Sequence, residues 1–109
     1  MDLEFRYEMH KDSEGDQIRL FGNIDSQCEQ QLKDLYARIT GKRILLDFSN
    51  TVRINSMGIA FLLRMLKQVK AEKRSQVMIT GENKTNALLF KMTGIYLLTE
   101  QGTAPDGRG

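Results

Sequence analysis

Two small polar residues, Asn55 and Ser56, stand directly before the apolar run Met57–Leu63. Both side chains carry an oxygen that can accept a backbone N–H which the first turn of a helix leaves unpaired. The Ser56 hydroxyl is also a nucleophile wherever a neighbouring base removes its proton. Ser56 is therefore the candidate functional residue of this sequence, and a plain helix cap is the competing interpretation.

Serine catalysis finds no support elsewhere in the sequence. A nucleophilic serine needs a base, and the single histidine, His10, lies in the opening segment with nothing to bring it to Ser56. No G-x-S-x-G motif surrounds Ser56, and no glycine-rich phosphate-binding or dinucleotide-binding motif occurs. His10 also has no second histidine or cysteine at metal-ligand spacing, so we expect neither a metal nor a cofactor. An enzyme is the least favoured function class.

The segment from Met57 to Lys73 contains no proline and is long enough for about four helical turns or more. One apolar face follows the three-and-four spacing of a buried helix and consists of Ile59, Leu62, Leu63, Leu66 and Val69. A second stripe of Met57, Phe61 and Met65 begins beside Ser56 and is rotated away from the first face. This stripe is either a wide core contact or a binding surface, since methionine is common on adaptable interfaces.

The elements that must position this stretch alternate between strands and helices. Short strands are predicted from their apolar patterns over residues 3–9, 18–20, 43–48 and 76–80. The polar turn 11–16 joins the first two strands as a hairpin, and a cluster of turn formers at 49–51 follows the third. The alternation with helices indicates a small α/β layer packing.

A helix is predicted between the second and third strands. Ser26 and Glu29 have the spacing of a capping box at its start, and Gly41 is expected to end it. Its apolar positions are Cys28, Leu32, Leu35, Tyr36 and Ile39. Cys28 has no activating neighbour in the sequence, so we expect a small buried hydrophobe rather than a reactive thiol.

The C-terminal third contains one more helix. A third amphipathic segment follows the turn 81–83 and ends before Gly94. Residues 96–98 then form either a final edge strand or a packing segment. From residue 101 to 109 no apolar pattern remains, so we expect a disordered tail after a single domain over residues 1–100.

Composition narrows the function classes further. The chain of 109 residues fits one domain, and its net charge of +2 comes from interspersed signs rather than from a nucleic-acid-binding patch. The lone cysteine cannot form an internal disulfide, and neither an N-terminal signal nor a spanning segment is present. We therefore expect a cytoplasmic protein without direct nucleic-acid binding or membrane insertion.

Four short motifs together resemble the STAS domain family. Residues 45–49, LLDFS, and residues 54–59, INSMGI, resemble its strand and elbow signature, in particular that of the bacterial anti-sigma factor antagonists. Residues 22–25, GNID, resemble the earlier G-x-[LI]-D turn of the family, and residues 93–95, TGI, resemble the T-G-[LI] near its C-terminus. The motifs occur in the family order and span nearly the whole chain.

The resemblance implies a fold and a mode of action. The fold would be a single α/β domain with a central mixed β-sheet and helices mainly on one side. The function would be that of a switch, without enzymatic activity, that binds a protein partner until Ser56 is phosphorylated. The implied partners are an anti-sigma-type serine kinase, often the bound partner itself, and a PP2C-like serine phosphatase that removes the phosphate.

The same resemblance assigns the surface around Ser56. Asp25 and Asp47 would each follow the end of a strand, with Asp25 in the partner-binding surface and Asp47 flanking the elbow. We expect the rest of the partner-binding surface to consist of Asn55, Met57, Phe61 and Met65.

Two residues depart from the family pattern. Asn55 stands where an aspartate is usual, which removes a negative charge beside the phosphoacceptor, and Met57 stands where a second hydroxyl residue is common. These changes leave the kinase specificity open. They also leave open an alternative function, as a docking module in a membrane transport or lipid-trafficking complex, like that of some STAS domains.

Overall fold

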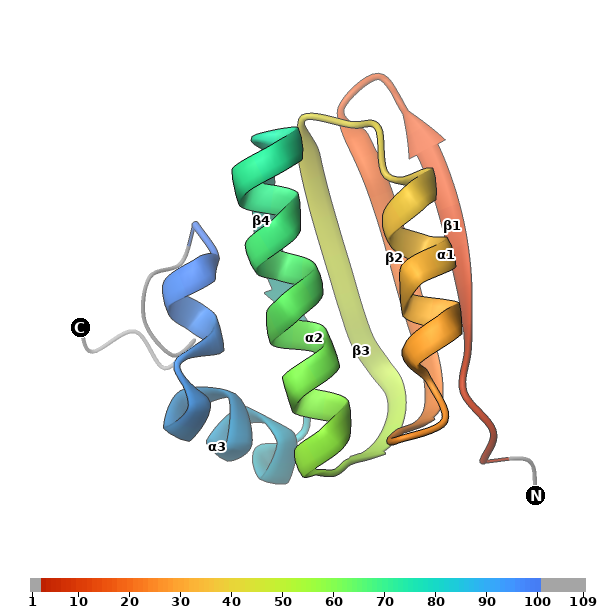
Figure 1. The fold of residues 1–109 in the computed structure, drawn as a ribbon, viewed down its shortest axis with the longest axis vertical. Helices are drawn as coiled ribbons and strands as arrows, with labels where there is room; N and C mark the ends of the chain where they lie inside the picture. The colour runs from red at the N-terminus through yellow and green to blue at the C-terminus, as the bar shows by residue number, and fades with distance from the viewer. Residues whose placement is uncertain (1–2, 101–109) are drawn as a thin grey trace.

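The computed structural model describes residues 3–100 and forms a two-layer α/β domain (Figure 1). Its elements follow in the order β1 (Arg6–Asp12), β2 (Gly15–Ile24), α1 (Glu29–Arg38), β3 (Arg43–Ile54), α2 (Ser56–Gln68), a π-helical turn η1 (Val69–Lys73), β4 (Gln76–Thr80), α3 (Lys84–Thr93) and a 3-10 turn η2 (Ile95–Leu98). The strands lie in the order β1-β2-β3-β4. The first pair is antiparallel and the other two are parallel, which confirms the mixed sheet.

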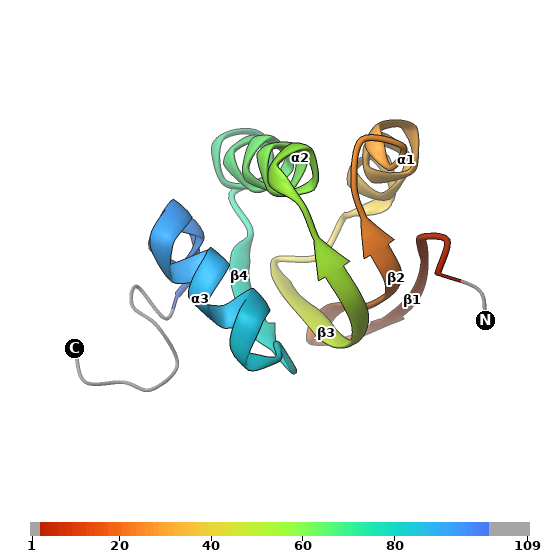
Figure 2. The same ribbon diagram turned by 90° about the horizontal axis from the view of Figure 1, so that it is seen from below.

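The two longer helices cover one face of this sheet. Figure 2 shows α1 and α2 side by side above the strands, with α3 beside the β4 edge. The core between the layers is built from alternate strand residues such as Ile18, Leu20 and Leu46, which are almost inaccessible to solvent. This arrangement confirms the predicted fold class with helices mainly on one side.

The hairpin and the last helix follow the sequence pattern closely. Asp12 closes the β1–β2 turn by accepting the N–H groups of Glu14 and Gly15 at 2.8 and 3.1 Å. Asn83 caps α3 by accepting the N–H of Asn86 at 2.8 Å, and Gly94 ends that helix in the left-handed conformation. Residues 95–98 form a packing turn rather than a strand. The tail expected over residues 101–109 lies outside the described residues.

The third strand is much longer than its sequence pattern predicts. Residues 49–51 were expected to form a turn, but β3 continues through them to Ile54. The pairing of β3 with β2 is irregular, with register shifts near Phe21 and again near Ile24. Buried Thr51 holds the irregular part in place because its hydroxyl donates to the Leu20 carbonyl at 3.0 Å. Turn-forming residue types are therefore accommodated inside an irregular strand.

The capping box expected at Ser26 and Glu29 is not formed. Asp25 organises this turn instead, since its side chain accepts the Gln27 N–H at 2.9 Å and its carbonyl accepts the Cys28 N–H at 3.2 Å. Glu29 becomes the first helical residue, and Cys28 at the cap position makes no side-chain capping bond. The helix therefore begins later than the sequence spacing suggests.

The end of α1 is also held by residues that are distant in sequence. The helix ends at Arg38 rather than at Gly41. Lys73 Nζ donates to the carbonyls of Tyr36 and Ile39 at 2.5 and 2.7 Å, which pairs the helix end with η1. A lysine at a helix C-terminus also interacts favourably with the negative end of the helix dipole.

A buried carboxylate ties the amino ends of β2 and β3 together. Asp16 is 3% exposed and accepts the N–H groups of Thr40 and Gly41 at 3.0 Å each, while Lys11 Nζ lies 3.0 Å from its other oxygen. Burial opposes ionisation of this group, but the Gly41 N–H, Lys11 and the Thr40 N–H more than offset it, so the pKa of Asp16 is lowered.

We expect Asp16→Asn to destabilise the fold by about 1.5–3 kcal/mol at pH 7, because a charged acceptor of three hydrogen bonds is lost. Since the folded-state pKa lies below the unfolded one, this stabilisation is present above the ordinary carboxylate pKa and is lost as pH falls through the folded-state value. Urea unfolding of both proteins from pH 7 into the acid range measures the difference. Glu14→Gln, on an exposed turn residue, is the control. Equal losses at Asp16 and Glu14 would contradict the role of Asp16.

Candidate functional site

Asn55, not Ser56, caps the helix that follows β3. Its backbone is extended, and its side-chain oxygen accepts the N–H of Gly58 at 2.9 Å. Ser56 is then the first residue of α2 and is exposed. Within residues 3–100 the Ser56 hydroxyl has no hydrogen-bond partner, so the interpretation of Ser56 as a plain cap is wrong.

The start of α2 is pressed against the end of β2. The N–H of Asn55 donates to the Ile24 carbonyl at 3.2 Å, and Ile24 pairs with Ile54 across the two strands. A Cβ atom added to Gly58 would lie 2.0 Å from that same carbonyl oxygen. Only glycine permits this approach, so Gly58 is a residue of the site that the motif contained but the sequence argument did not single out.

Asp25 lies where the sequence predicts, directly after the end of β2. Because Ile24 and Ile54 are paired, Asp25 and Asn55 leave neighbouring strands at the same edge of the sheet. Asp25 is half-buried, and its carboxylate is partly engaged by the N–H of Gln27. The structure therefore places Asp25 at the same end of the domain as Ser56.

Cys28 is buried beneath this loop. It is 1% exposed, and its Sγ atom lies 3.4 Å from the Asn23 carbonyl and 3.3 Å from the Asp25 N–H. Burial raises the pKa of the Cys28 thiol, which disfavours the nucleophilic thiolate. The expected role as a small buried hydrophobe agrees with this position.

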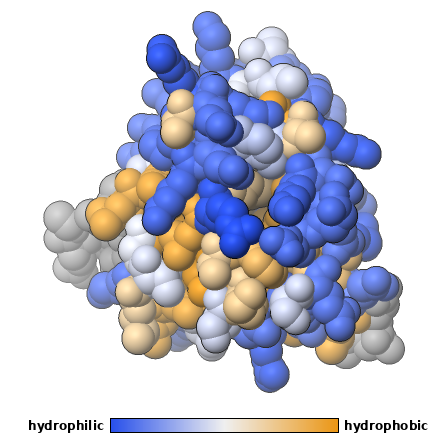
Figure 3. All heavy atoms as spheres, viewed as in Figure 1, coloured by the Kyte–Doolittle hydropathy of each residue, from blue (hydrophilic) through white to orange (hydrophobic). Residues whose placement is uncertain are grey.

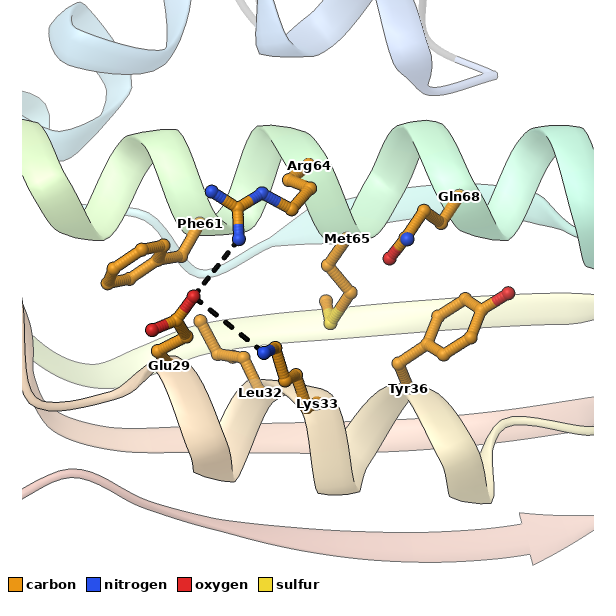
Figure 4. A pocket seen from close by; sticks show the side chains of 8 residues that line it. All are labelled: Glu29, Leu32, Lys33, Tyr36, Phe61, Arg64, Met65 and Gln68. Carbon is orange, nitrogen blue, oxygen red and sulfur yellow. Dashed lines mark hydrogen bonds and ion pairs between the residues drawn. The ribbon is translucent and has the colours of Figure 1, made fainter.

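The stripe of Met57, Phe61 and Met65 does not form one exposed surface. Met57 is 48% exposed, whereas Phe61 and Met65 are 7% and 3% exposed. Figure 4 shows Phe61 and Met65 directed from α2 towards Leu32 and the other side chains of α1. The expectation that the whole stripe lies off the core is wrong, because α1 packs against this side of α2 and covers its second and third members.

A shallow groove of about 230 Å³ remains between the two helices above these buried side chains. Its rim carries an ion pair, with Arg64 at 3.1 Å and Lys33 at 3.9 Å from the same oxygen of Glu29 (Figure 4). These groups are exposed, so their net contribution to stability is small. The groove is part of the α1–α2 packing contact, and Met57 lies outside its lining.

Asp47 lies inside β3 rather than at its end. The sequence argument placed it at the end of a strand, but β3 continues seven residues beyond it to Ile54. Its carboxylate accepts the N–H and the hydroxyl of Ser49 at 2.9 and 2.6 Å, next to Gly81. Asp47 pairs with Arg19 of β2 and with Thr80, the last residue of β4, and the expectation that it ends its own strand is wrong.

Neither the histidine nor a group of potential metal ligands lies near Ser56 within residues 3–100. His10 pairs with Gln17 at the opposite end of the strands from the elbow. Among residues 3–100, no group of three or more histidine, cysteine, aspartate and glutamate side chains could hold a metal ion. No helix in the same range is both long and apolar enough to cross a membrane. The site therefore consists of an exposed hydroxyl and the surface around it.

Comparison with known proteins assigns the family. The family model described as STAS domain matches residues 10–100, most of the chain. The chain belongs to the STAS domain family. No curated protein sequence matches it. This STAS domain has the strand–elbow–helix order that its sequence motifs predict, with Ser56 at the start of α2.

Solved structures share the fold at low sequence identity. The anti-sigma factor antagonist SpoIIAA in its unphosphorylated form is 16% identical, with a TM-score of 0.69 over 86% of this chain and 85% of that one. An anti-sigma factor antagonist from Mycobacterium paratuberculosis is 16% identical, with a TM-score of 0.66 over 89% and 84%. The Bacillus cell fate determinant SpoIIAA in its phosphorylated form is 19% identical, with a TM-score of 0.61 over 88% of each chain.

The different burial of Phe61 and Met57 predicts different effects of substitution on stability. We expect Phe61→Ala to cost about 3–5 kcal/mol of unfolding free energy, because it leaves a cavity between α1 and α2. Met57→Ala, on an exposed side chain of the same helix, should change stability by no more than about 0.5 kcal/mol. Urea unfolding monitored by circular dichroism compares the two variants. Equal losses of unfolding free energy in the two variants would show that burial does not determine the contribution of Phe61 to stability.

Proposed function

We propose that this STAS domain is a protein-binding switch of the anti-sigma factor antagonist type. It binds its partner while the Ser56 hydroxyl is free and releases the partner when Ser56 is phosphorylated. The observation that carries this proposal is the position of Ser56, which is exposed at the first position of α2 while Asn55 performs the capping. The fold therefore does not need the hydroxyl, which stays available for modification.

The position also suits a phosphate group. The N–H groups of the first helical turn have no partner within the helix, and the positive end of the helix dipole points at the same place. Asn55 already uses the Gly58 N–H, which leaves those of Ser56 and Met57 for a phosphate. Because Asn55 carries no charge, it does not repel the phosphate as the aspartate usual in the family would.

The partner would contact the surface that surrounds this helix start. Met57 offers the exposed apolar side chain next to Ser56, and Asp25 and Asn55 offer polar groups at the adjoining strand ends. Phe61 and Met65 contribute by holding α2 against α1 rather than by touching the partner. A phosphate adds about −1.5 to −2 charges and would desolvate unfavourably against an apolar contact at Met57.

The names of the structural relatives support a pathway in which phosphorylation controls binding to a partner. One of them, SpoIIAA, has been solved in phosphorylated and unphosphorylated forms, and it is named an anti-sigma factor antagonist. By analogy, the partner of this chain would be an anti-sigma-type serine kinase, and a PP2C-like phosphatase would restore the free hydroxyl. In this role the domain is a cytoplasmic binding protein without catalysis of its own.

Substitutions at Ser56 test the switch directly. We expect Ser56→Ala to retain its partner under all growth conditions and Ser56→Asp to bind it weakly, since a carboxylate places charge in the interface. Affinity capture with each variant, followed by a kinase assay on the bound protein, measures both properties. Ser13→Asp, on the exposed hairpin at the other end of the domain, is the matched control.

Phosphate mapping of the protein from cells completes this test. Thr51 is the nearest alternative acceptor, but it is 5% exposed and its hydroxyl is bonded to Leu20. Mass spectrometry should therefore find phosphate on Ser56 and not on Thr51. Phosphate on Thr51 alone, or a captured membrane permease in place of a kinase, would contradict the proposal.

Phosphorylation should act at the interface and leave the fold intact. We expect the phosphorylated domain to melt at the same temperature as the free one or slightly higher, because the helix N-terminus stabilises negative charge by about 0.3–1 kcal/mol. Thermal melts at low salt, where this effect is least screened, compare the two forms. In Asn55→Asp the phosphate should lose its benefit through repulsion. A clearly lower melting temperature of the phosphorylated wild type would show that the switch works by disrupting α2.

A further inference from the structure

The end of the domain opposite Ser56 contains a second hollow, lined mainly by cations. It lies where β3 and β4 begin and where η1 ends, and it has a volume of about 390 Å³. Its lining consists of Lys42, Arg43, Lys73, Arg74 and Gln76. Figure 3 shows that this end of the molecule, at the top of the view, is covered mostly by hydrophilic side chains.

Some of the positive charge in this region has a structural explanation. Lys73 donates to two carbonyls at the end of α1, and Lys11 pairs with Asp16 at 3.0 Å. Lys70 pairs with Glu100 at 3.3 Å. These three lysines serve helix ends and ion pairs, so their positions need no ligand.

The other three cations have no such explanation. Lys42, Arg43 and Arg74 are exposed, and within residues 3–100 none of them has an ion pair or a side-chain hydrogen bond. Asp12 and Glu14 line a neighbouring hollow with Arg43 but form no ion pair with it.

Arg74 adds an independent observation, because its backbone is strained. It has φ 53° and ψ 33° after η1 and is the sole non-glycine residue with positive φ among those described. Glycine is the usual residue in this left-handed position at a helix end, since a Cβ atom disfavours it. An arginine here gives up that conformational advantage while its guanidinium serves no contact within residues 3–100, which points to an external role for the side chain.

We propose that this hollow binds a phosphate group through Lys42, Arg43 and Arg74. A guanidinium donates two parallel hydrogen bonds to phosphate oxygens, and the adjacent lysine adds charge. Gln76, which pairs with Arg43 across the strands, offers an amide donor in the same lining. The lining contains no aromatic side chain on which a base could stack, so the recognised group is the phosphate itself. The site is separate from Ser56 and does not depend on the proposed switch.

Titration of the full chain with inorganic phosphate and then pyrophosphate tests the site. At constant ionic strength, the changes in amide chemical shift should reach a plateau as ligand is added. They should be confined to residues around 41–43 and 73–76. Arg74→Gly should weaken binding about tenfold or more, as expected for the loss of a charged hydrogen-bonding group. The same change should leave the fold as stable or more stable, because glycine suits the left-handed backbone. A purely structural role of Arg74 would give no loss of binding.

Lys84→Gln, an exposed charge change at the start of α3, is the matched control and should bind as the wild type does. Vesicles of phosphatidylcholine with and without phosphatidic acid then identify the source of the phosphate. Binding to the phosphatidic acid vesicles that Arg74→Gly abolishes would assign a lipid headgroup, and binding of the soluble ions alone would assign a free phosphate. Shifts that do not saturate, or equal losses in Arg74→Gly and Lys84→Gln, would overturn the proposal.

Discussion

The close approach of the first turn of α2 to the end of β2 is the constraint on which the position of Ser56 depends. The Ile24 carbonyl accepts the N–H of Asn55, and the missing side chain of Gly58 lets the helix lie directly against the same carbonyl. The parallel pairing of Ile24 with Ile54 holds the ends of β2 and β3 side by side. The helix start is therefore fixed by the sheet and not by a free loop.

At this junction two adjacent residues differ in what the fold requires of them. Asn55 satisfies the helix end, so Ser56 can change its chemical state without removing a hydrogen bond that the fold needs. Since the helix N-terminus favours negative charge, a phosphate at Ser56 meets a compatible environment within the domain. In the proposed switch, the unfavourable effect of that phosphate would fall on a partner packed against Met57 and not on the fold.

The two ends of the strands carry different features. The carboxyl ends of β2 and β3 carry the start of α2 and the neutral or acidic residues Asn55 and Asp25. The opposite end carries Lys73, which donates to two carbonyls at the end of α1, and the cations Lys42, Arg43 and Arg74 of the hollow. The position of Lys73 is favourable also because the C-terminal end of α1 carries the negative end of the helix dipole.

Local chemistry in the sequence was enough to determine the hairpin, the end of α3 before Gly94 and the position of Ser56 at a helix start, and the family motifs gave the mixed α/β fold. The tertiary structure alone decided which candidate surfaces are open. Phe61 and Met65 have the residue types of a binding stripe, but α1 covers them, and the spacing within one helix carries no information on its neighbour. Turn-forming residues after Asp47 remained in a strand because pairing with β2 outweighs local preference. Likewise, Lys42 and Arg74 are separated in sequence and meet only because β3 and β4 begin side by side, so long-range strand pairing assembles the cationic hollow.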